Sequence, residues 1–160
     1  MRFPFEQRAL RQAVLAFGLA LPLGLVPGEA PARGDTQPVP FRVVEDAIPE
    51  PLTNQPGDAE RGRAVALDRS RGNCITCHEM PVQADFQGNL GPPLDGLAQR
   101  YTVGELRLRV VDSKRINPES NMPSFYRIEG LYNVRRDWVG RTMLTAQEVE
   151  DLLAYLMTLR

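Results

Sequence analysis

Two thiols and the only imidazole of the chain lie within five consecutive residues, Cys74-Ile75-Thr76-Cys77-His78. Residues three apart on a helical turn share a face, so both thiols can reach one flat ligand while His78 presents a ring nitrogen beside them. This C-x-x-C-H spacing is the attachment sequence of c-type haem. It predicts one haem c, bound covalently through Cys74 and Cys77, with His78 as an axial ligand of the iron.

Other chemistries of paired cysteines fit this segment less well. A thioredoxin-like dithiol belongs to a βαβ pattern, which the sequence does not show. A zinc site needs four ligands, whereas the chain has two cysteines and one histidine in total. A disulfide would suit an exported protein but would not account for the adjacent histidine. Haem is therefore the favoured interpretation.

The sixth ligand of the iron must be another residue type, and methionine is the next candidate. Three of the five methionines are set aside because of their place in the chain: Met1, Met80 and Met157. Met122 and Met143 remain. Met122 is favoured because it precedes Pro123 in a stiffened loop, far enough along the chain from His78 to reach the opposite side of a porphyrin. Met143 directly precedes the last predicted helix and is interpreted as a packing residue.

Two further features could serve a haem. The carbonyl of Pro92 could accept a hydrogen bond from the second ring nitrogen of His78, which would orient the imidazole and raise its basicity; the alternative is a tight loop without this bond. The arginines of residues 127–141, or the indole of Trp138, could contact the haem propionates. A solvated docking loop explains this stretch equally well.

Composition and charge exclude some function classes. The chain has 160 residues, enough for one domain and a short extra segment. Its net charge of −1 argues against nucleic-acid binding, which requires a basic face. Aromatic residues make up only 7%, a small supply for an all-protein core, and a buried haem would supplement it.

The first 32 residues have the pattern of a secretory signal peptide. A positively charged start is followed by an apolar run over 13–26 and by the small residues Ala30 and Ala32. We therefore expect cleavage near Ala32 and a periplasmic mature protein. The alternative is an uncleaved membrane anchor.

The remaining chain predicts an all-α domain with an extended N-terminal arm. Residues 33–57 are rich in proline and acidic residues and indicate a PPII-like arm, whereas 58–160 carry helical patterns. Asp58 should cap a first helix ending near residue 68, in which Gly62 indicates close approach of another backbone. Capping boxes begin helices at Thr102 and Thr145. We expect the last helix to pack against the first, with Tyr155 near Gly62, and Arg107 and Arg109 to face solvent.

The chain from residue 58 onward resembles the class I cytochromes c, and more closely the SoxX family, the mono-haem subunits of SoxAX complexes in bacterial thiosulfate oxidation. The matching stretches are 55–62, 86–90, 91–97, 110–118, 121–126 and 144–151. The segment from 110 to 126 is far more specific than C-x-x-C-H alone.

The resemblance implies a class I cytochrome c-like helical fold around one covalent haem and makes Met122 the distal ligand. It also implies a SoxA-like cytochrome partner that carries the catalytic site, since this chain has no further cysteine to hold sulfur. Such a complex, an L-cysteine S-thiosulfotransferase, couples thiosulfate oxidatively to a cysteine of a SoxYZ-like carrier. This chain would accept the electrons and pass them to a soluble cytochrome c. The alternatives are a free electron shuttle to a terminal oxidase and a peroxidase-like enzyme.

Overall fold

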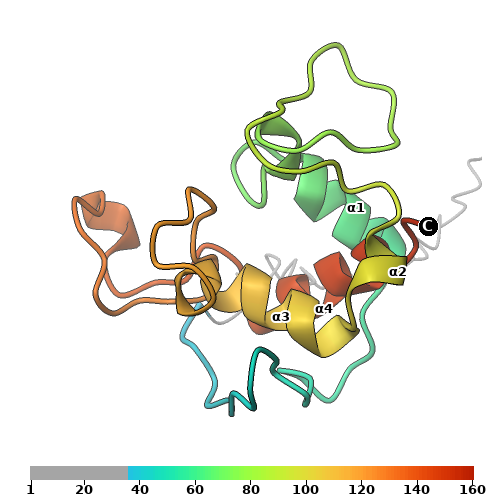
Figure 1. Cartoon of the computed structure of the whole chain (residues 1–160). Helices are drawn as coiled ribbons and strands as arrows, with labels where there is room; N and C mark the ends of the chain where they lie inside the picture. The colour runs from blue at the N-terminus through green and yellow to red at the C-terminus, as the bar shows by residue number, and fades with distance from the viewer. Residues whose placement is uncertain (1–35) are drawn as a thin grey trace, which may run out of the picture. The chain divides into compact units, whose positions relative to one another are not determined.

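The structure, a computed structural model, describes residues 36–160. Its regular elements in that range are all helical and are joined by long loops, with no strand among them (Figure 1). The elements in chain order are α1 (Ala59–Leu67), η1 (Cys74–Thr76), α2 (Leu97–Arg100), α3 (Val103–Asp112), η2 (Ser113–Arg115), η3 (Arg136–Trp138) and α4 (Ala146–Leu156). The predicted all-α class is confirmed. The predicted signal peptide, 1–32, lies outside the described residues. Within them, none of the helices has the length and apolar character needed to cross a membrane.

The helix starts follow from their capping residues. The side chain of Asp58 accepts a hydrogen bond from the Arg61 amide at the start of α1. Both predicted capping boxes form: Thr102 with Glu105 at α3, and Thr145 with Glu148 at α4. In each box the side chains satisfy amides that have no partner within the helix, so the sequence fixes where α3 and α4 begin.

The contact between α1 and α4 is the main packing interface (Figure 1). A Cβ atom at position 62 would overlap the carbonyl oxygen of Asp151, and one at position 57 would overlap that of Glu150. Glycine at both positions therefore lets the two backbones approach. The predicted close approach at Gly62 is confirmed, but backbone atoms of Asp151 and Leu152, and not Tyr155, lie nearest to it.

A charged contact fixes the same interface. The Asp151 carboxylate accepts hydrogen bonds from Arg61 Nε at 2.7 Å, Arg61 Nη2 at 2.8 Å and the Asp58 amide at 2.8 Å. Burial alone would raise the pKa of Asp151, but the hydrogen bonds from Arg61, Gln147 and Asp58 outweigh it and leave the pKa below its ordinary value. The carboxylate therefore stabilises the folded state in its charged form.

The arm packs against the helical domain of its own chain. Ile48 is fully buried and Leu52 nearly so. Arg107 is 3% exposed; it donates to both carboxylate oxygens of Glu150 at 2.8 Å and to the carbonyl of Ile48 at 2.7 Å, while Glu150 accepts from the Leu52 amide. The expectation that Arg107 faces solvent was wrong, because its partners lie far away in sequence. Arg109 lies over the Tyr101 ring, 4.2 Å from its centroid.

Candidate haem site

The cysteines and the histidine lie on one tight turn. In η1 the Cys77 amide donates to the Cys74 carbonyl at 3.1 Å, and the His78 amide donates to the same carbonyl at 2.9 Å. Both thiols are free of disulfide bonding and partly buried. The turn therefore brings two thiols and an imidazole together in one short helical segment, as the spacing predicts.

The His78 ring is oriented by a carbonyl. Its Nδ1 lies 2.7 Å from the carbonyl oxygen of Pro92, so with Nδ1 as the donor, Nε2 keeps a lone pair for a metal. A Cβ atom at position 91 would overlap the imidazole, at Cε1 first. Gly91 thus lets the backbone pass directly against the ring. The structure places Pro92 as the sequence predicts.

Residues 79–91 form a long loop that returns to the cysteine turn and is hydrogen-bonded to it (Figure 1). The Gly88 amide donates to the Ile75 carbonyl at 2.8 Å, and the Gly91 amide donates to the Cys77 carbonyl at 2.8 Å. A Cβ atom at position 88 would overlap the carbonyl oxygen of Thr76. The cysteine turn is therefore braced through backbone atoms at two points.

Met122 is held differently. Its side chain is partly buried and packs against the core, while its backbone groups bond to side chains. The Met122 carbonyl accepts from Ser113 Oγ at 2.6 Å and from Lys114 Nζ at 3.3 Å, and its amide donates to Ser120 Oγ at 3.2 Å. Met143, the other candidate ligand, is 38% exposed. The ligand role of Met122 stays a prediction.

The donor set fits a covalently bound haem better than the competing chemistries. Burial raises the pKa of the Cys74 thiol to about 11. A thiol with so high a pKa stays protonated near neutral pH, which disfavours a redox dithiol, because redox thiols react as thiolates. Within residues 36–160, no group of three or more His, Cys, Asp or Glu side chains could hold a metal ion. One imidazole and two thiols on a single turn are what a c-type haem uses.

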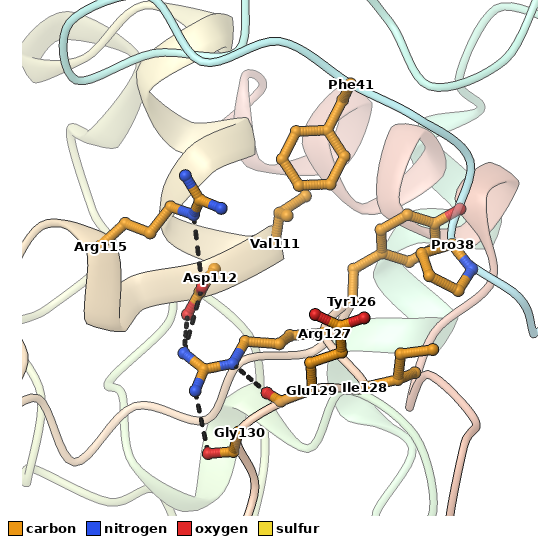
Figure 2. Close-up of a pocket in the computed structure, with 10 residues that line it drawn as sticks. All are labelled: Pro38, Phe41, Val111, Asp112, Arg115, Tyr126, Arg127, Ile128, Glu129 and Gly130. Carbon is orange, nitrogen blue, oxygen red and sulfur yellow. Dashed lines mark hydrogen bonds and ion pairs between the residues drawn. The ribbon is translucent and has the colours of Figure 1, made fainter.

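A surface cavity whose lining includes none of these residues lies between the arm and α3 (Figure 2). Pro38 and Phe41 line one side. On the other, Asp112 lies between Arg115, at 3.6 Å, and Arg127, at 3.3 Å. Arg127 also donates to backbone carbonyls of residues 129 and 130. Its guanidinium is thus engaged within the chain. The propionate role of the arginines of 127–141 and of Trp138 stays a prediction.

Sequence reasoning missed Gly88, Ser113 and Lys114. Glycine is needed at position 88 because the backbone there lies against the Thr76 carbonyl, a contact that only the fold reveals. Lys114 is the single lysine among the 19 basic residues of the chain. This unusual choice of residue was the one sequence feature that could have drawn attention to it.

Comparisons with known proteins agree with this geometry. Residues 59–160 match the family described as Cytochrome c. A chain of the crystal structure of SoxXA from P. pantotrophus is 33% identical, with a TM-score of 0.70; the match covers 78% of this chain and 97% of that one. No curated protein sequence matches. The match therefore covers nearly all of the solved chain.

Proposed function

The chain belongs to the cytochrome c family, and from this premise we propose that it is the electron-accepting, SoxX-type subunit of a periplasmic thiosulfate-oxidising complex. Electron transfer is the role that the family and the similarity to SoxXA support. When bound, the haem supplies one-electron chemistry through its iron. The observation that carries the proposal is the cysteine turn, with the His78 ring held by the Pro92 carbonyl.

In this proposal each site residue has one task. Cys74 and Cys77 would hold a single haem covalently, His78 and Met122 would be the ligands of its iron, and the Pro92 carbonyl orients the imidazole. With His78 and Met122 both as ligands, the iron would serve electron transfer and would not bind a substrate. Methionine as a ligand raises the reduction potential, which suits an acceptor of electrons.

The partners follow from the similarity to SoxXA. We propose a SoxA-like cytochrome subunit as the direct partner, because this chain has no cysteine beyond Cys74 and Cys77 to hold a sulfur intermediate. The substrate of the complex would be thiosulfate, coupled to a SoxYZ-like carrier, and a soluble cytochrome c would take the electrons. Residues 1–32 would be the cleaved signal peptide, 33–57 the arm and 58–160 the cytochrome domain.

The arm does not itself argue for a permanent partner. Ile48 and Leu52 are buried against the chain's own helices. The part of the arm that carries them therefore packs on this domain and is not free to bind another subunit there. The complex therefore rests on the similarity and on the residues of the site. The free-shuttle alternative is not favoured by that similarity.

Reconstitution tests the proposal directly. The haem-loaded chain is co-expressed with the SoxA-like subunit of its source, purified by a C-terminal tag, and mixed with thiosulfate and the SoxYZ-like carrier. We expect an equimolar complex whose haem on this chain becomes reduced only when thiosulfate and carrier are both present. A chain that elutes alone, with haem intact and no reduction, would refute the complex and favour a shuttle.

A further inference from the structure

The backbone of Met122 is hydrogen-bonded by two side chains of η2 and by one of the loop that precedes it. Ser113 Oγ donates to the Met122 carbonyl at 2.6 Å, and Lys114 Nζ reaches both that carbonyl, at 3.3 Å, and the carbonyl of Ser120. Ser120 Oγ accepts the Met122 amide at 3.2 Å. Both hydrogen-bonding groups of the Met122 backbone are thus satisfied by side chains.

The residues that make these contacts have a rigid base. Ser113 and Lys114 begin η2, directly after α3, whose residues Leu108 and Val111 are buried. Ser113 is itself buried, at 5% exposure. The residues that bond to Met122 are therefore anchored to the core of the domain.

A lysine is suited to this task in a way that the chain's other basic residues are not. An ammonium group is compact and carries three donors, so it can bond two carbonyls at different angles. The guanidinium of arginine is a planar fork suited to carboxylates and phosphates. Lys114 is the only lysine of the chain, and it lies where two carbonyls of one loop converge.

We propose that Ser113 and Lys114 are positioning residues that hold the Met122 loop closed, and so set how firmly Met122 occupies the distal position of the haem. This inference rests on the proposed role of Met122. Removing either donor would raise the fraction of molecules with the loop open. A small ligand that binds the open form would then bind more tightly in proportion to that fraction.

The test is an imidazole titration of the ferric, haem-loaded chain, followed by absorption, together with the reduction potential. For Lys114→Met we expect the imidazole Kd to fall about tenfold, equivalent to about 1.4 kcal/mol. For Ser113→Ala we expect a fall of about threefold. The potential should fall in both, because methionine ligation raises it. Lys114→Arg should rescue only partly, since it keeps the charge but not the geometry.

Arg42→Met is the matched control, because it removes one positive charge from an exposed side chain of the arm and should leave the imidazole Kd unchanged. An unchanged Kd in Ser113→Ala would overturn the inference even if Lys114→Met failed to fold. If Met122→Ala binds imidazole far more tightly than the native chain while both positioning variants do not, the ligand assignment stands and the inference falls. If Met122→Ala also binds like the native chain, the proposed ligand itself is wrong.

Discussion

The cysteine turn and the Met122 loop, which carry the two proposed iron ligands, are held by different means. Residues 74–91 are joined by backbone hydrogen bonds, such as Gly88 to Ile75 and Gly91 to Cys77, and by glycines that admit close contact. Met122 is held by Ser113, Lys114 and Ser120 side chains.

The difference separates two kinds of control. A backbone contact at a glycine cannot be adjusted by small steps, because any side chain there overlaps a neighbouring backbone or ring atom. A side-chain contact can be weakened one donor at a time. The proximal side should therefore decide whether the haem site forms, and the distal side should decide how firmly the second ligand binds.

Gly91→Ala should have the largest effect. The added Cβ overlaps the His78 ring, which is itself tied to Pro92, so we expect a loss of about 3 kcal/mol in unfolding free energy and little haem attachment. Gly96→Ala is the matched control: no atom lies within 4 Å of its added Cβ, and only the left-handed backbone, at φ 67°, costs about 1 kcal/mol. Thermal unfolding and the ratio of haem to protein are measured for both variants. Equal losses of stability and haem in Gly91→Ala and Gly96→Ala would contradict the special role of the contact between Gly91 and His78.

Arg107→Met should come next, at about 3 kcal/mol, because it leaves the buried Glu150 carboxylate without its cation. The arm should then become sensitive to limited proteolysis near Ile48, whose carbonyl loses its donor. The imidazole Kd of the ferric protein should not change. A changed Kd would show that the arm and the distal loop are coupled, contrary to the comparison.

Asp151→Asn tests the junction of α1 and α4, outside the cysteine turn and the Met122 loop. The folded state lowers the pKa of Asp151, so its stabilisation is complete above the ordinary aspartate pKa and is lost as the pH falls through the folded value. We expect the variant to be about 2 kcal/mol less stable near neutral pH. Its unfolding free energy should converge with that of the native chain in acid. A constant difference down to the lowest pH would disprove the assignment.

Ser120→Ala should have the smallest effect. It tests how much a single side-chain hydrogen bond contributes to holding the Met122 loop. It removes the acceptor of the Met122 amide but leaves both donors to the Met122 carbonyl. We expect normal haem attachment, a stability loss of about 1 kcal/mol or less, and a modest fall in the imidazole Kd. Loss of haem attachment would contradict the separation of the two sides.

Local signals allowed much of the fold to be predicted. The capping pairs at Thr102 and Thr145 locate α3 and α4, and Asp58 locates α1, because each depends on residues three apart in sequence. Helix α2 was missed; it has four residues, and its N-cap is Gly96 in the left-handed conformation, without a side-chain hydrogen bond.

Contacts between distant residues could not be predicted in the same way. Arg107 looks like a solvent-facing arginine until Glu150 and Ile48 are placed beside it. The proximal half of the site is readable because Cys74, Cys77 and His78 are adjacent. Lys114 bonds to backbone carbonyls, which any residue supplies, so no residue type nearby reveals its partner.

The most direct test of the account is the proton NMR spectrum of the ferrous, haem-loaded chain in three forms: native, Met122→Leu and Met143→Leu. A methionine on the iron gives a methyl resonance shifted far upfield by the porphyrin ring. The account predicts this resonance in the native chain and in Met143→Leu, and its loss in Met122→Leu. Loss in Met143→Leu instead, or its persistence in Met122→Leu, would contradict the assignment of the distal ligand.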